Sequence, residues 1–444
     1  MTTEKKSGAL VAIIAMMFLY AMISFVTNLA APIGTIWQNQ PEIGGSATLG
    51  MMGNMMNFAA YLFMGIPAGM LLTKIGYKKT ALVAVAVGFF GVLIQYLSGF
   101  PTGMAGFYVY LLGAFVSGFS VCMLNTVVNP MLNLIGGGGN KGNQLNMIGG
   151  TFNSLAGTLT PMFVGALIGQ VTKDTVITQV NPALYLALGV FAAVFVILLF
   201  TPISDPEVGK VTSETKFEHS AWSFRHFVLG VVAIFIYVGV EVGIPATLIY
   251  YISDVDTVFP DSHWLIANID VIPANAAAIA GFVAGTYWLL MLIGRIIGGA
   301  IAGKVSSKTM LTFVSAVGVA LVLFGMFFSP DANVNMPIFT GTGFSTAEVD
   351  LNAFVLVLVG LCTSVMWSCI FNLATEGLGK YTSKASGIFM MMVVGGGVLP
   401  LIQSFLIGKV GYLMSYIVPL IGLIYILFYA LVGCKNVNKD IPVD

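Results

Sequence analysis

The sequence has few charged residues for its length. Only 8% of its 444 residues are Asp, Glu, Lys or Arg, whereas charged residues make up about a quarter of an ordinary soluble domain. Hydrophobic residues account for 58%, and the apolar runs repeatedly reach the ~20 residues that a helix needs to cross a bilayer. The composition therefore excludes a soluble globular domain and favours a membrane protein built from helices, since lipid offers no partner to an unpaired backbone group.

The chain also lacks the patterns of several other classes of protein. Its four cysteines lie in or beside apolar runs without CxxC spacing, which argues against a disulfide framework and a zinc site. The formal net charge is zero, so nucleic acid is not an expected partner. The stretch GGGGNKGN does not fit the phosphate-binding pattern GxxxxGK[ST]. No cofactor is expected, and no nucleophile and base at a shared depth indicate a membrane enzyme.

Twelve apolar runs predict an all-α membrane protein with twelve transmembrane helices. They form two sets of six, so we expect an N-terminal bundle at 1–201, a linker at 202–223 and a C-terminal bundle at 224–444. Two related six-helix halves are common in secondary transporters, which bind substrate near the midplane between them. The predicted spans are 9–34, 47–72, 80–99, 105–134, 146–170, 182–201, 224–252, 274–303, 309–329, 351–376, 385–408 and 413–434.

The basic residues predict how the chain lies in the membrane. If both termini are cytoplasmic, fifteen Lys and Arg fall in cytoplasmic segments and only Lys173 and Lys409 fall outside. The opposite orientation would contradict the positive-inside rule. The N-terminal MTTEKKSG runs into the first apolar run without a small-residue cleavage site, so we expect it to begin the first span.

Three asparagines stand four residues apart in the fourth run, within MLNTVVNPMLNLIGGGGNKGN. Asn125, Asn129 and Asn133 therefore share one helix face, and an unpaired carboxamide in hydrocarbon costs several kcal/mol, so this face must meet protein or water. Other spans add Asn28, Asn57, Gln95, Asn153 and Asn372.

The amides have two interpretations. They either join helices, at about 0.6 kcal/mol per contact, or they line a hydrated cavity. Amides both donate and accept hydrogen bonds, which suits sugar hydroxyls, and Tyr20, Tyr237 and Trp367 offer aromatic faces for the C–H surfaces of a sugar. For the row in the fourth span, together with Asn28 and Asn153, we favour the cavity.

Glu241 is the one acidic residue deep within a predicted span. It follows Arg225 by about 24 Å of helix rise, and Pro245 removes the backbone hydrogen bond to its carbonyl, which predicts a helix break at the acid. An intramembrane acid is a candidate for ion coupling, although it can instead accept hydrogen bonds from a sugar or pair across helices. Arg295, the one basic residue within a span, is consistent with snorkelling or with an inner gate.

Five stretches, in order, resemble the fucose:proton symporter branch of the major facilitator superfamily. They are PAGMLLTKIGYKK, NTVVNPMLNLIG, TFNSLAGTLTP, YVGVEVGI and IFNLATEGLGKYTSKASGIFMMMVVGGGVLP. The resemblance implies the major facilitator fold and sugar transport. It also shows departures, because members of the branch usually carry carboxylates where this chain has Asn28 and Asn125, and a Gln where it has Glu241.

Together these features predict uptake of a hexose or deoxyhexose across a bacterial inner membrane by alternating access. Glu241 is the expected coupling residue, with the proton as first and sodium as second choice of ion. An uncoupled facilitator, an export pump for drugs or lipids, and a sugar sensor remain alternatives. Besides sugar and ion, lipid is the expected partner, and the resemblance implies that the protein functions as a monomer. The candidate sugar-binding residues are Tyr20, Asn28, Asn125, Asn129, Asn153, Tyr237, Glu241, Trp367 and Asn372.

Overall fold

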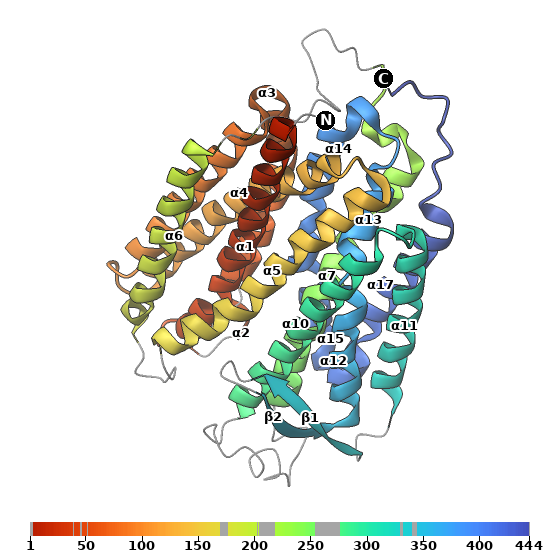
Figure 1. Cartoon of the computed structure of the whole chain (residues 1–444). Coiled ribbons are helices and arrows are strands. Elements are labelled where there is room, and N and C mark those ends of the chain that lie inside the picture. The colour runs from red at the N-terminus through yellow and green to blue at the C-terminus, as the bar shows by residue number, and fades with distance from the viewer. Residues whose placement is uncertain are drawn as a thin grey trace.

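The two halves of the chain form two helical bundles that lie side by side (Figure 1). The N- and C-terminal ends lie on one side of the molecule, here called the termini side, and a β-hairpin lies on the opposite, hairpin side (Figure 1). Most of the predicted linker 202–223 falls outside the described residues. The computed structural model describes residues 3–38, 40–44, 47–50, 52–168, 176–201, 203, 218–253, 276–328, 332–339 and 344–443.

The first bundle contains the helices of the N-terminal half. They are α1 (Thr3–Gln38), α2 (Ala47–Gly50), α3 (Met52–Leu97), α4 (Met104–Ile135), α5 (Gly139–Ile168), the short 3-10 helix η1 (Ile177–Val180) and α6 (Asn181–Phe200).

The second bundle contains the helices of the C-terminal half. Its first members are η2 (Ala221–Ser223), α7 (Arg225–Ser253), α10 (Ala276–Ile301) and α11 (Ser307–Phe327). After the hairpin come α12 (Leu351–Thr363), α13 (Met366–Thr375), η3 (Gly379–Tyr381), α14 (Thr382–Met391), η4 (Met392–Val394), α15 (Gly395–Val410), α16 (Tyr412–Ser415), α17 (Ile417–Phe428) and the π-helical turn η5 (Tyr429–Gly433).

Ten stretches of the described chain are long and apolar enough to cross a membrane. One of them, Met52–Leu97, holds two spans, because Gly76 adopts a φ of 81° and turns the chain between them. α5 is not among the ten, since its sequence is rich in Asn and Gly, yet its 30 residues run beside α1 through the first bundle. Together these account for the twelve predicted transmembrane helices.

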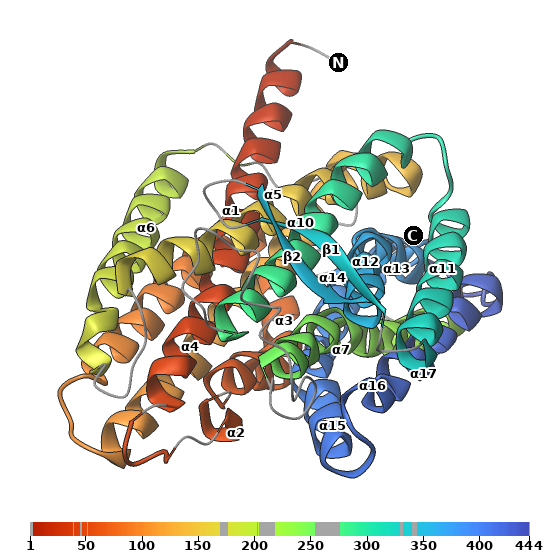
Figure 2. The ribbon, with the colours of Figure 1, turned by 90° about the horizontal axis from the view of Figure 1, so that it is seen from below.

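A β-hairpin between α11 and α12 was not predicted from the sequence. Strands β1 (Asn333–Phe339) and β2 (Phe344–Asp350) pair antiparallel, with Asn333 opposite Asp350. Alternate residues, among them Met336, Ile338 and Val349, are buried, as the two-residue period of a strand requires. The hairpin lies beside α10 and α12 on the hairpin side (Figures 1 and 2).

The predicted helix break at Glu241 is wrong. α7 is continuous from Arg225 to Ser253 and includes Pro245. A proline removes one backbone hydrogen bond, and neighbouring helices in a bundle can compensate for that loss. The carbonyl of Glu241 therefore loses its usual helical donor without ending the helix.

The tenth span is interrupted instead, between α12 and α13. The interruption falls at Ser364 and Val365, where the sequence offers neither Gly nor Pro. The carbonyl oxygens of Thr363 and Ser364 accept hydrogen bonds from Tyr237 and Arg295. Side chains from α7 and α10 thus take the place of intrahelical donors, and backbone acceptors become available within the bundle.

A buried acid joins the hairpin to the helices on the hairpin side. Asp350 ends β2 and caps α12, because its Oδ1 accepts a hydrogen bond from the backbone N–H of Ala353 at 3.2 Å. Its Oδ2 accepts a hydrogen bond of 2.5 Å from the hydroxyl of Tyr251 in α7. The residue is only 1% exposed, and this burial raises the pKa of its carboxyl group to about 6.

This pKa predicts how pH changes the stability of the hairpin side. Because the folded protein binds the proton more tightly than the unfolded chain, the stabilising effect of protonation is complete below pH ~4 and is lost as pH rises through ~6. Asp350→Asn keeps one oxygen to cap α12 and replaces the other with an amide NH2 that can donate to the hydroxyl oxygen of Tyr251, without the charge. It should raise the melting temperature at pH 7.5 more than at pH 5. The gain corresponds to at most about 3 kcal/mol. Melting curves of parent and variant from pH 5 to 7.5 test this, and an equal difference at every pH would contradict it.

Candidate functional site

A cavity of about 130 Å³ lies between the two bundles. Because a water needs roughly 10–15 Å³ by this measure, the cavity has room for on the order of ten waters, which is comparable to the number of heavy atoms in a hexose. The residues that line it come from both bundles: Tyr20, Ile23, Ser24, Thr27, Asn28, Phe58, Asn125, Gly150, Asn153, Val238, Glu241, Val242, Trp288, Arg295, Trp367, Ser368 and Val393.

Six of the nine candidate residues line this cavity. They are Tyr20, Asn28, Asn125, Asn153, Glu241 and Trp367. The amides are held in place by neighbouring groups of the first bundle. Asn28 Nδ2 donates to the carbonyl oxygen of Ser24 at 2.8 Å, Asn125 Nδ2 to the hydroxyl of Tyr61 at 2.8 Å, and Asn153 Nδ2 to the carbonyl oxygen of Tyr20 at 3.1 Å. Each amide thus has a fixed orientation in the wall of the cavity.

Asn129 lies beneath the cavity and is not part of its lining. Its Oδ1 accepts hydrogen bonds from the hydroxyl of Tyr20 and, at 2.8 Å, from the indole N–H of Trp367. Its Nδ2 donates to the carbonyl oxygen of Asn125 at 2.9 Å. Since Asn129 belongs to α4 and Trp367 to α13, the indole bond joins the two bundles and forms a floor on the termini side.

The other two candidate residues also lie away from the cavity lining. Tyr237 is fully buried behind Trp367, with ring centroids 6.2 Å apart, and donates to the carbonyl oxygen of Thr363 at 3.1 Å. Asn372 is closer to the termini side, where its Nδ2 donates to Ser307 Oγ at 2.9 Å and its Oδ1 accepts from Asn133 at 3.2 Å. Tyr237 supports the aromatic wall, and Asn372 belongs to the contact between the bundles.

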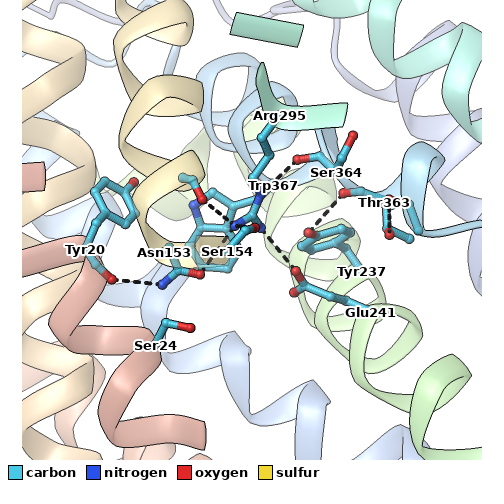
Figure 3. A network of polar contacts seen from close by, with 12 residues as sticks. Tyr20, Ser24, Asn153, Ser154, Tyr237, Glu241, Arg295, Thr363, Ser364 and Trp367 are labelled. Atoms are coloured by element: carbon cyan, nitrogen blue, oxygen red, sulfur yellow. Dashed lines mark hydrogen bonds and ion pairs between the residues drawn. The ribbon is translucent and has the colours of Figure 1, made fainter. Parts of the chain in front are cut away.

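The cavity contains an ion pair between Glu241 and Arg295. Arg295 Nη2 lies 3.3 Å from Glu241 Oε1, and their side chains are 9% (Arg295) and 14% (Glu241) exposed. The same guanidinium reaches α5 of the other bundle, where Nη1 donates to the carbonyl oxygen of Gly150 at 2.8 Å and to Ser154 Oγ at 2.7 Å (Figure 3). The pair therefore gives the cavity one charge of each sign, and Arg295 ties the second bundle to the first.

Sequence reasoning did not assign Arg295 to the site. Its side chain points into the protein, so the snorkelling interpretation is wrong. The signal was present, because Arg295 is the basic counterpart of Glu241 and intramembrane ionisable residues pair with one another. Ser24 and Thr27 were also missed, although Tyr20, Ser24 and Asn28 repeat at the four-residue spacing that identified the row in α4.

Gln95 is a buried amide that joins two helices and does not line the cavity. Its Nε2 donates to Ser117 Oγ at 2.9 Å, so it joins α3 to α4 within the first bundle and lies away from the cavity.

In the part of the chain that the structure describes, no three His, Cys, Asp or Glu side chains converge on a site for a metal ion. The chemistry of the cavity is therefore that of amides, hydroxyls, indoles and one ion pair.

Comparisons with known proteins agree with this architecture. The Major Facilitator Superfamily profile matches residues 13–400. The glucose/galactose transporter of Brucella abortus biovar 1 (strain 9-941) is 27% identical over 442 residues, covering 98% of this chain and 96% of its own. The L-fucose-proton symporter of Escherichia coli (strain K12) is 22% identical, covering 80% of this chain and 77% of its own.

A solved structure shows the same fold. The crystal structure of the fucose:proton symporter of E. coli superimposes with a TM-score of 0.73 at 17% sequence identity, covering 95% of this chain and 98% of that one. These matches confirm the predicted fold and the predicted transporter class, as opposed to an enzyme. The chain belongs to the Major Facilitator Superfamily.

Proposed function

We propose that the protein carries a hexose or deoxyhexose across the membrane by alternating access. The observation that carries this proposal is the cavity between the bundles, where Asn28, Asn125 and Asn153 offer donors and acceptors beside the indoles of Trp288 and Trp367. Such a lining suits a polyol with apolar C–H faces. The similar glucose/galactose transporter and fucose-proton symporter support the same class of substrate.

We further propose that the membrane is the bacterial inner membrane and that the termini side is cytoplasmic. The excess of Lys and Arg in the segments on that side supports this orientation. With this orientation, the bond between Trp367 and Asn129 closes the cavity toward the cytoplasm. The cavity then receives sugar from outside when the bundles separate on the hairpin side.

We propose that Glu241 couples transport to a cation. While Glu241 is ionised, it balances the charge of Arg295; on protonation, the guanidinium keeps only its neutral acceptors. Because Arg295 contacts both bundles, the charge on Glu241 changes how strongly the bundles are joined. The proton is our first choice of ion and sodium the second. An uncoupled facilitator is the second candidate, since Asn28 and Asn125 occupy positions where the resembled branch carries carboxylates.

Proteoliposomes test both parts of this proposal. Labelled glucose, galactose and fucose are offered under an imposed pH gradient, an imposed sodium gradient, or neither. Accumulation above equilibrium under one gradient would identify the ion, and uptake that only equilibrates would identify a facilitator. An export pump for drugs or lipids would show no saturable sugar uptake, and neither would a sugar sensor.

Glu241→Gln separates coupling from sugar binding. The amide keeps the shape and can accept a hydrogen bond, but it cannot exchange a proton, so accumulation driven by a pH gradient should fall to the equilibrium ratio. Exchange of labelled for unlabelled sugar, which needs no net proton movement, should persist, reduced by about ten- to a hundredfold, because a lost hydrogen bond to a charged group is worth ~1.5–3 kcal/mol. Glu42→Gln, in an exposed loop, is the matched control. Concentrative uptake by Glu241→Gln would show that this acid does not couple.

A further inference from the structure

One face of α5 continues from the cavity toward the termini side. Asn143, Asn146, Gly150 and Asn153 are spaced by three and four residues, so they share a helix face. Gly150 and Asn153 line the cavity. Asn143 and Asn146 lie nearer the start of α5, on the termini side, and both are at most 1% exposed. The polar wall of the cavity therefore extends beneath its floor.

Neutral hydrogen bonds join the two bundles at this level. Asn143 Nδ2 and Asn372 Nδ2 both donate to Ser307 Oγ at 2.9 Å. Asn133 Nδ2 donates to Asn372 Oδ1 at 3.2 Å, and Gln144 Nε2 donates to the carbonyl oxygen of Gly299 at 2.8 Å. A sugar that leaves the cavity toward the termini side must pass through this layer. The bonds that Asn143, Asn133 and Gln144 make to the second bundle therefore break when the bundles separate there.

Two polar atoms on this face have no partner in the closed arrangement. Asn143 Oδ1, an acceptor, and Asn146 Nδ2, a donor, are buried and form no hydrogen bond. A buried polar group without a partner costs free energy. The hydrogen bonds that join the bundles at this level use neither of these two atoms. An acceptor and a donor one helical turn apart match neighbouring hydroxyls of a polyol, each of which can donate and accept.

We propose that Asn143 and Asn146 form a second, transient sugar subsite on the exit path, which binds hydroxyls once the bundles have separated on the termini side. The proposal rests on the proposed function, because its ligand is the transported sugar. Asn143, Asn372 and Asn133 exchange their bonds across the bundle boundary for bonds to the sugar. Asn146 Nδ2 gains its first partner in the same step.

Asn146→Leu tests the subsite without breaking a bond between the bundles. The oxygen of Asn146 accepts only a long contact of 3.4 Å from Tyr20, which belongs to the same bundle. Leucine has a similar size and removes the unpaired donor. Gln95→Leu is the matched control, because it replaces another buried amide of the first bundle that lies away from the path. Half-saturation concentrations for labelled glucose are measured on the termini face in inside-out vesicles and on the hairpin face in right-side-out vesicles.

The subsite predicts that Asn146→Leu raises half-saturation on the termini side about fivefold more than it lowers half-saturation on the hairpin side. The lost hydrogen bond to the sugar acts on the termini side alone, whereas relief of the unpaired donor in the closed arrangement changes both sides equally and in opposite directions. Gln95→Leu should change neither. Two results would overturn the proposal: no change on either face, as for a structural amide, or a rise on the termini face matched by a fall on the hairpin face, as for a shifted balance between states. Failure of the proposed function is distinct, because the parent protein itself would then show no saturable sugar transport.

Discussion

Arg295→Gln is expected to reduce sugar transport at least a hundredfold and to destabilise the protein. The change leaves the carboxylate of Glu241 without its counter-charge in a site where that side chain is only 14% exposed. Removing one partner of a buried ion pair costs about 3–5 kcal/mol. The change also removes charged hydrogen bonds to Gly150 and Ser154 of the other bundle. Melting curves in detergent and sugar exchange in proteoliposomes measure the two effects.

The double variant Arg295→Gln/Glu241→Gln isolates the contribution of the charge. With both charges removed, no unpaired ion remains, so the melting temperature should recover most of the loss seen in Arg295→Gln. Arg295→Lys keeps the charge as a point donor without the planar fork. It should retain most of the stability but lose the simultaneous contact with α5 and α7. If Arg295→Gln alone melts at the same temperature as the double variant, the ion pair does not determine stability.

The spans could be predicted from the sequence because hydrocarbon imposes a strict length and composition on each helix. Glu241 could be identified as a site residue for the same reason, because a single acid within an apolar run must face the interior of the protein and not the lipid. The spacing of Asn125, Asn129 and Asn133 correctly predicted one inward face. It did not predict that Asn125 lines the cavity while Asn129 forms its floor and Asn133 contacts the other bundle.

Other features depend on contacts between residues far apart in the sequence. No local signal in the sequence predicts the interruption of the helix at Ser364. It is stabilised by Tyr237 and Arg295, which lie far away in the sequence and donate hydrogen bonds to the backbone carbonyl oxygens there. Trp367 bonds to Asn129 across 238 positions of the chain, which no periodicity reveals. Pro245 gave a strong local signal for a break, yet the packed bundle tolerates it within a continuous helix. In the first two cases, hydrogen bonds between residues far apart in the sequence outweighed local preference.

Gly387→Val should prevent the bundles from closing on the termini side. A Cβ on Gly387 of α14 would lie 2.6 Å from the carbonyl oxygen of Gly65 in α3, and a Cβ on Gly65 would lie 2.6 Å from the backbone nitrogen of Met391. The obstructing atoms belong to the backbone, so they cannot rotate away as a side chain would. Overpacking of this kind costs about 1–3 kcal/mol or more, which lowers the population of the closed state by roughly one to two orders of magnitude.

The expected result for Gly387→Val is therefore a ten- to hundredfold loss of sugar uptake, with the cavity accessible from the termini side. Reaction of Cys369, which lies beside Asn143 in the closed layer, with a membrane-impermeant thiol reagent added on that side reports the opening. Gly189→Val is the matched control, because a Cβ at Gly189 in α6 meets no atom within 4 Å, and it should transport like the parent. Normal uptake and an unreactive Cys369 in Gly387→Val would show that the close approach of α3 and α14 is not needed for closure. A reactive Cys369 combined with lost uptake would show that the close packing at these two glycines is what closes the termini side.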